Sequence, residues 1–92
     1  MIVIKWSDKS LLDLERLYTF LASVNKSAAA QVIQSLTKAP NNLLVTPRIG
    51  ERLPEFEPRE IRRLFVGKYE LRYEIKQSSI YILRIWHTKE NR

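Results

Sequence analysis

The side chains of this 92-residue sequence that can carry out chemistry are few, which narrows the reactions open to it. The sequence contains no cysteine, so neither a disulfide nor a thiolate nucleophile is available. Its single histidine, His87, can exchange a proton near neutral pH, or it can have only a structural role at the edge of a sheet. One histidine without cysteines does not make a zinc site. We therefore expect neither a metal nor another cofactor.

Positive charge is the other chemical feature of the sequence. The 16 Lys and Arg residues outnumber the 10 Asp and Glu residues, and the net charge of +6 favours an anionic partner such as nucleic acid or an acidic protein segment. An arginine cluster on an open sheet face can bind either partner, although a solvated charged face is the alternative, and direct nucleic-acid contact stays open. Most basic residues follow residue 47, and the candidate partner-binding residues are Arg48, Arg52, Arg62, Arg63, Arg72 and Arg84.

The first half of the chain is predicted to form a short strand and a helical hairpin within a single domain, residues 1–92. Residues 2–6 are β-branched and aromatic, as in a strand, and Ser7 or Asp8 can cap the helix that follows. The helical spacing over residues 8–23 places Asp13 and Arg16 on the solvent side. The predicted apolar stripe of this helix consists of Leu11, Leu14, Leu17, Tyr18 and Leu21.

The second helix is predicted to begin after Asn25 or Ser27 and to bend at Pro40, with a kinked continuation to about Val45. The link between the two helices is short, so they should form an antiparallel hairpin. The predicted buried stripe of the second helix consists of Ala29, Val32, Ile33 and Leu36.

The second half is predicted to form a three-stranded antiparallel meander. Residues 46–60 hold three of the four prolines and are expected to be a loop. Strands are expected at 59–66, 69–76 and 80–87, with a type II′ turn at Gly67 and Lys68 and another turn at 77–79. Residues 88–92 are polar and are expected to fray. The order β-α-α-β-β-β defines an α+β fold.

Side-chain alternation then predicts which residues share a face. Arg62 and Arg63 are neighbours on a strand, so only one of them shares a face with Phe65. We expect the other arginine on the helix-free side, with Arg72 or Arg84. Two tryptophans, Trp6 and Trp86, are expected to pack in the core, with stacking on a nucleobase as the alternative.

The order and spacing of these segments resemble the RelE/ParE toxin superfamily over nearly the whole chain. Residues 49–55 are similar to the family's Gly-Arg-x-x-Pro-Glu loop, with Glu51 inserted between Gly50 and Arg52. Residues 62–69 look like its strand, glycine turn and tyrosine, and Tyr73 matches the tyrosine of its next strand. Residues 82–87 are similar to its final strand.

Two chemistries occur in this superfamily: RelE-like ribosome-dependent messenger RNA endonucleases, and ParE-like proteins that inhibit DNA gyrase without catalysis. A metal-independent endoribonuclease needs a general base, a general acid and an arginine at the phosphate. Glu70 stands where RelE-like toxins carry an arginine, and no tyrosine follows His87, so these departures favour the ParE-like branch. By resemblance, a nuclease would use Arg63, Arg84, His87 and Lys89.

The resemblance therefore implies the toxin of a type II toxin-antitoxin system, which inhibits DNA gyrase by binding and blocks replication. It implies a cognate antitoxin whose C-terminal segment covers the sheet or the helical groove, in a possible hetero-oligomer. The alternatives are the endoribonuclease and a non-toxic binding module of the same fold. The apolar run at residues 1–4 is too short for a signal peptide, and no run reaches membrane-spanning length, so we expect a cytoplasmic protein.

Overall fold

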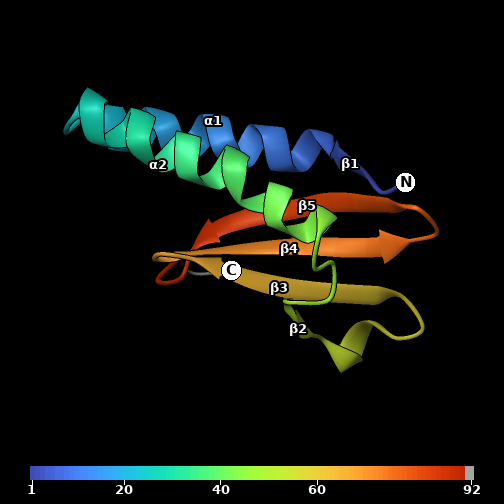
Figure 1. Cartoon of the computed structure of the whole chain (residues 1–92). Helices are drawn as coiled ribbons and strands as arrows, with labels where there is room; N and C mark the ends of the chain where they lie inside the picture. The colour runs from blue at the N-terminus through green and yellow to red at the C-terminus, as the bar shows by residue number, and fades with distance from the viewer. Residues whose placement is uncertain (91–92) are drawn as a thin grey trace.

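The computed structural model describes residues 1–90 as an open five-stranded sheet with a helical hairpin on one face (Figure 1). The prediction of an α+β fold is confirmed. The elements in chain order are β1 (Val3–Trp6), α1 (Asp8–Ala22), α2 (Lys26–Lys38), the 3₁₀ helix η1 (Ala39–Leu44), β2 (Glu51–Arg52), the 3₁₀ helix η2 (Pro54–Phe56), β3 (Glu60–Val66), β4 (Tyr69–Lys76) and β5 (Ser79–His87).

The sheet has the strand order β1-β5-β4-β3-β2, in which β1 runs parallel to β5 and the other pairs are antiparallel. The predicted meander is therefore present, with the N-terminal strand added beside its last strand. The prediction missed β2, which pairs Glu51 with Arg63 and Arg52 with Arg62 inside the supposed loop 46–60. A strand of two residues is too short to produce a periodic pattern.

Both helices begin at side-chain caps. The Oγ of Ser7 accepts the backbone N–H of Ser10 at 3.0 Å, and the Oδ1 of Asn25 accepts that of Ala28 at 3.0 Å. Beyond Lys38 the chain continues as η1, because Pro40 lacks the N–H that an α-helix would need but fits a first 3₁₀ turn. No helix among residues 1–90 is long and apolar enough to cross a membrane.

The core lies between the hairpin and the sheet, and α1 contributes to it differently from the prediction. Leu17 is buried, but Leu11 and Tyr18 are exposed, whereas Asp13 is only 4% exposed. The buried face of α1 is thus rotated toward Asp13, against the prediction that this residue faces solvent. The stripe predicted for α2 is confirmed, and the fully enclosed cluster consists of Leu17, Leu36, Leu43, Leu71, Tyr73, Ile80, Ile82 and Ile85.

A β-bulge in β5 explains why the Asp13 carboxylate of α1 is buried against this strand. Tyr73 pairs with Ile82 and Arg72 pairs with Arg84, so Leu83 is an extra residue in β5. The backbone N–H of Ile85 donates to Asp13 Oδ2 at 2.8 Å, and the guanidinium of Arg84 donates to both oxygens of Asp13 at 2.8 and 3.2 Å. A buried charge requires such partners, and here they join α1 to β5.

The turn between β3 and β4 and the residues after β5 complete the sheet. The φ angle of Gly67 is 58°, and that of Lys68 is not positive, as the predicted type II′ turn requires. The expected fraying from residue 88 is wrong for the described part, because Thr88 N–H donates to Lys68 C=O at 2.9 Å and Glu90 pairs with Arg16 at 2.8 Å. Asn91 and Arg92 lie outside the described residues.

Replacing Asp13 by alanine tests the importance of this junction. We expect Asp13→Ala to lower the free energy of unfolding by about 2–4 kcal/mol, because it leaves the Ile85 N–H and the Arg84 guanidinium without their acceptor. Urea denaturation followed by circular dichroism measures the change. Glu15→Ala is the matched control, since Glu15 is an exposed carboxylate on the same helix. Equal stability of the two variants would contradict the expectation.

Candidate functional site

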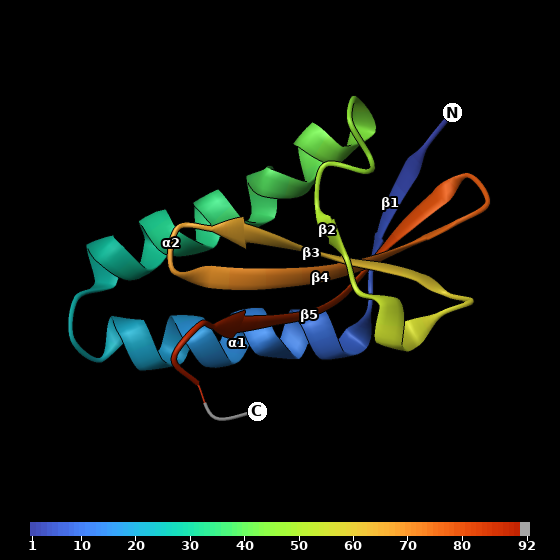
Figure 2. The ribbon, with the colours of Figure 1, turned by 90° about the horizontal axis from the view of Figure 1, so that it is seen from below.

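The helix-free face of the sheet carries two rows of side chains that run across neighbouring strands. Figure 2 views the sheet from this side, where no α-helix covers the strands. Arg63 on β3 pairs with Arg72 on β4, which pairs with Arg84 on β5. The next row consists of Phe65, Glu70 and Trp86. We call Arg63, Phe65, Arg72, Arg84 and Trp86 the arginine–aromatic face.

Each arginine of this face has a carboxylate of its own. The Nε atoms of Arg63, Arg72 and Arg84 lie 2.8 Å from Glu51, Glu70 and Asp13, respectively. The hydrogen bonds that Arg63 donates to Glu51 and Arg84 donates to Asp13 raise the pKa values of the two arginines, so both stay charged. The Glu70 side chain is 1% exposed and the Asp13 side chain 5%, against 25% for Arg72 and 40% for Arg84. Two of the three carboxylates are thus buried while the guanidinium groups reach solvent.

Planar groups stack on this face. The guanidinium carbon of Arg72 lies 4.7 Å from the ring centre of Trp86 and 5.8 Å from that of Phe56 in η2. Arg84 lies 5.2 Å from Trp86, and Arg63 lies 5.3 Å from Phe65. These distances fall within the range of cation–π contacts. A shallow cavity of about 490 Å³ opens beside Phe56, Arg72, Arg84 and Trp86.

Two predictions about these faces are wrong. Arg63 shares its face with Phe65, and this is the helix-free face, whereas Arg62 lies on the helix side. Phe65 is 52% exposed, so it does not mark the core as the prediction assumed. Trp6 packs against the core as expected, but Trp86 lies on the arginine–aromatic face, because the bulge at Leu83 reverses the alternation of β5.

Residues of the loop 46–50 are held by hydrogen bonds to the sheet. The Tyr73 hydroxyl donates to Pro47 C=O at 2.8 Å and accepts the Gly50 N–H at 3.0 Å. Arg62 donates to Gly50 C=O at 2.7 Å. A Cβ atom on Gly50 would lie 2.7 Å from the Arg63 carbonyl oxygen and 2.7 Å from the Tyr73 hydroxyl, so only glycine fits. Burial raises the pKa of Tyr73, which therefore keeps the proton it donates.

The remaining candidate arginines also pair with carboxylates. Arg48 and Arg62 both bind Glu60 at 2.9 Å, and although burial alone would raise the pKa of Glu60, these hydrogen bonds lower it overall. Arg52 lies 3.6 Å from Glu57.

Arg59, which the sequence did not single out, pairs with Glu74 at 2.8 Å and lowers its pKa through a side-chain hydrogen bond. Each of the eight arginines within residues 1–90 forms an ion pair, and none of the seven lysines does. The excess positive charge therefore lies on lysines.

The four residues considered for a nuclease are not brought together. Arg63 and Arg84 lie on the helix-free face, whereas His87 pairs across from Tyr69 on the opposite face. The His87 ring makes an edge contact with Tyr69 at 5.2 Å, and its Nδ1 accepts the backbone N–H of Lys89 at 3.1 Å. These contacts hold the His87 side chain against Tyr69 and the backbone of Lys89 at the end of β5.

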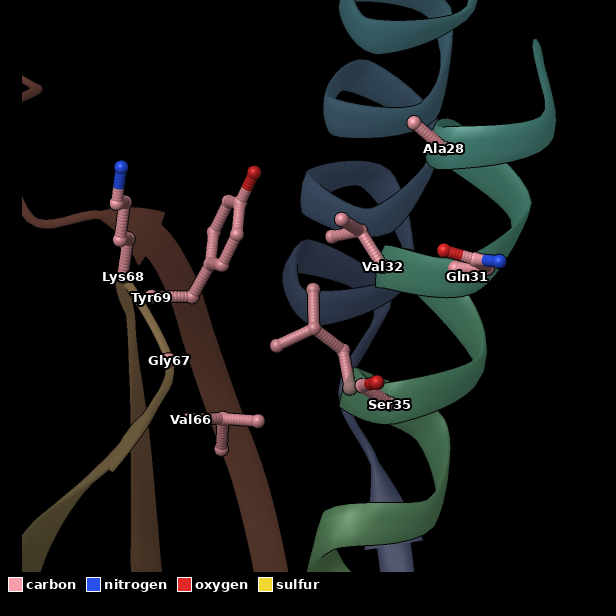
Figure 3. A pocket seen from close by; sticks show the side chains of 9 residues that line it. Ala28, Gln31, Val32, Ser35, Val66, Gly67, Lys68 and Tyr69 are labelled. Atoms are coloured by element: carbon pink, nitrogen blue, oxygen red, sulfur yellow. The ribbon is translucent and has the colours of Figure 1, made fainter. Parts of the chain in front are cut away.

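A groove lies between the free end of the helical hairpin and the turn that joins β3 to β4. Lys68 and Tyr69 extend from this turn beside Val32 and Ala28 of α2 (Figure 3), around a cavity of about 470 Å³. The same two residues border a second cavity of about 750 Å³, which is lined by Phe20 of α1, His87 and Lys89, among others. We call these two adjoining cavities the hairpin groove. Apolar side chains line most of it, with Lys68 and Lys89 at the rim.

Comparison with known proteins gives a family and a fold. The sequence matches the family model described as the ParE toxin of type II toxin-antitoxin system, parDE, over residues 4–92. The fold is similar to a chain of the chromosomal ParDE TA system from P. aeruginosa, with a TM-score of 0.75 and 24% sequence identity over 92% of this chain and 94% of that chain. No curated protein matches the sequence.

The sequence interpretation missed the residues that organise both surfaces. Asp13 lies four positions before the buried Leu17 and three after the buried Ser10, so its helical spacing could have shown that it faces the core. Glu70 is buried although its strand alternates, because arginines cover the helix-free face. No spacing signal identifies the hairpin groove, since its residues come from α1, α2 and a turn that are distant in sequence.

A substitution at Gly50 tests the close packing of its loop on the sheet. We expect Gly50→Ala to lower the free energy of unfolding by about 2–3 kcal/mol, because the added Cβ overlaps a backbone carbonyl as well as the Tyr73 hydroxyl. The comparison is Gly67→Ala, where the space is open and only the positive φ costs about 1 kcal/mol. Thermal unfolding measures both, and a smaller loss at Gly50 than at Gly67 would refute the clash.

Proposed function

The chain belongs to the ParE toxin family of type II toxin-antitoxin systems, and from this premise we propose that it arrests growth by binding DNA gyrase rather than by catalysing a reaction. On this proposal, binding to gyrase blocks replication, and a cognate antitoxin neutralises the protein by covering it. The family supplies the target by analogy, and the geometry supports the mode of action.

The separation of the candidate catalytic groups is the observation that carries this proposal. Cleavage of a phosphodiester requires a base, an acid and a phosphate-binding cation around one reacting group. Here Arg63 and Arg84 lie on one face, each beside a carboxylate, and His87 lies on the other. Glu70 also lies in the row next to the arginines, where its buried carboxylate binds Arg72, so no cation stands at that position to clamp a scissile phosphate. These features support inhibition by binding.

For the antitoxin, we propose the hairpin groove as the docking site of its C-terminal segment. The groove offers apolar surface from Val32, Phe20 and Tyr69, of which Phe20 is 71% exposed. The rim offers Lys68 and Lys89, which form no ion pair within residues 1–90. A segment with apolar residues flanked by carboxylates complements both features, and folding on the groove would cover the apolar surface.

The gyrase proposal predicts the outcome of a supercoiling assay. Stepwise addition of the purified protein to gyrase, relaxed plasmid and ATP should inhibit supercoiling with accumulation of cleaved plasmid. His87→Ala should inhibit equally at equal folded concentration, because His87 has a structural role in this reading. Circular dichroism corrects for any loss of fold in the variant.

Two outcomes of this assay favour the alternatives. Unimpaired supercoiling by a protein that still arrests growth, together with loss of toxicity in His87→Ala, would identify an endoribonuclease acting on ribosome-bound messenger RNA. Growth that is unaffected by the protein without its antitoxin would identify a non-toxic binding module.

The docking proposal predicts a charge effect on antitoxin binding. We expect Lys68→Glu with Lys89→Glu to weaken binding of the antitoxin's C-terminal segment by about tenfold or more, since rim charges of like sign oppose the acidic segment. Isothermal titration calorimetry with the synthetic segment measures the affinity. Lys38→Glu with Lys76→Glu makes the same change in net charge at exposed positions outside the groove. Equal weakening by both pairs would refute docking in the groove.

A further inference from the structure

The arginine–aromatic face concentrates like charges in a way that a sheet normally avoids. Arg63, Arg72 and Arg84 occupy directly paired positions on three adjacent strands, so their backbones fall within about 10 Å of one another. Like charges directly opposite each other destabilise a sheet. The carboxylates of Glu51, Glu70 and Asp13 offset this repulsion, and they also hold each arginine in a fixed position.

The same contacts leave donor groups for a ligand. Arg63 and Arg72 donate to their carboxylates through Nε, so their terminal nitrogens are not used in those bonds. Arg84 uses Nε and one terminal nitrogen, so the second terminal nitrogen remains. The side chains of Arg63 and Arg84 are 32% and 40% exposed. Three fixed guanidinium groups thus present N–H donors across the sheet, as phosphate oxygens require.

The aromatic row supplies the second kind of contact. Phe65 is half exposed on β3. Trp86 lies two strands away in the same row, and the guanidinium groups of Arg72 and Arg84 both make cation–π contacts with its ring. Aromatic rings and guanidinium planes both stack on nucleobases, which are planar and carry a π-face whatever their sequence. A purely acidic peptide would use the arginines but would have no group to stack on Phe65.

We propose that the arginine–aromatic face binds single-stranded nucleic acid, with phosphates on the arginine row and a base stacked on Phe65. A single strand suits this face because the bases of a duplex are paired inside it and cannot stack on a flat sheet. The inference goes beyond the proposed function and does not depend on gyrase or on the antitoxin, because neither takes part in the binding.

Fluorescence anisotropy of labelled 12-nucleotide probes tests this proposal with the purified chain alone. We expect binding of oligo(dT), of oligo(rU) or of both, and the comparison of the two identifies DNA or RNA as the preferred source of the shared chemistry. Phe65→Ala should weaken binding at least about fivefold, as expected for the loss of one stacked base. Arg63→Gln should reduce the slope of log Kd against log salt concentration by about 0.7, as for one lost phosphate contact.

Matched controls separate this site from general attraction to a basic protein. Tyr18→Ala removes another exposed aromatic ring, from α1, and Lys26→Gln with Lys38→Gln removes charge from α2 on the other side of the sheet. Both should leave Kd within about twofold, because neither lies on the arginine–aromatic face. Non-specific attraction depends on total charge and would instead weaken with the loss of the two lysines. Urea denaturation shows that each variant is folded.

Three results would overturn the proposal. The first is no binding of either probe at 50 mM salt. The second is a loss of affinity in the controls as large as that in Phe65→Ala, because the attraction would then be non-specific. The third is competition by duplex DNA or by poly(Glu), at equal charge concentration, as effective as competition by unlabelled single strand.

Discussion

The contact between the Asp13 carboxylate and the bulge in β5 determines what both faces of the sheet present. Without the extra residue Leu83, strict alternation from Ile82 would turn Arg84 toward the helices and Ile85 away from them. The bulge corrects this, and Asp13 accepts the backbone N–H of Ile85 just after the extra residue. One buried carboxylate therefore fixes the register of the core and the exposure of Arg84 and Trp86 together.

Arginines and lysines have different surroundings in this protein. Arginines pair with carboxylates on and around the sheet, and Glu70 and Glu74 are buried beneath side chains that remain in solvent. The planar guanidinium group suits such fixed pairing, whereas the flexible ammonium of lysine stays hydrated. The protein thus combines a rigid, nearly charge-balanced sheet face with mobile positive charge at Lys68 and Lys89 beside the hairpin groove. We therefore expect shape and stacking to determine selectivity on the arginine–aromatic face, and long-range attraction to be stronger at the hairpin groove.

The parts of the fold that sequence periodicity predicted are those in which the period is uninterrupted. The alternation of β4, the apolar stripe of α2 and the glycine turn at Gly67 all follow local rules, and the structure has them. The error at Trp86 arises from the bulge, which reverses the alternation of β5. The errors at Arg63 and Asp13 have other causes, since Phe65 is exposed rather than buried and the buried face of α1 is rotated toward Asp13. Of the candidate binding residues, Arg63, Arg72 and Arg84 do share a face, while Arg48 and Arg62 hold Glu60 and the loop before β2.

The parallel pairing of β1 with β5 has a consequence for the order of events during synthesis. Among the strands of residues 1–90, Val3–Trp6 is synthesised first, yet it pairs with residues 79–82 of β5, which is synthesised last. The core residues Ile80, Ile82 and Ile85 also belong to that last strand. Contacts so distant in sequence form late in folding. A nascent chain therefore cannot complete the five-stranded sheet before β5 has been synthesised, and neither face of the sheet has its final form until then.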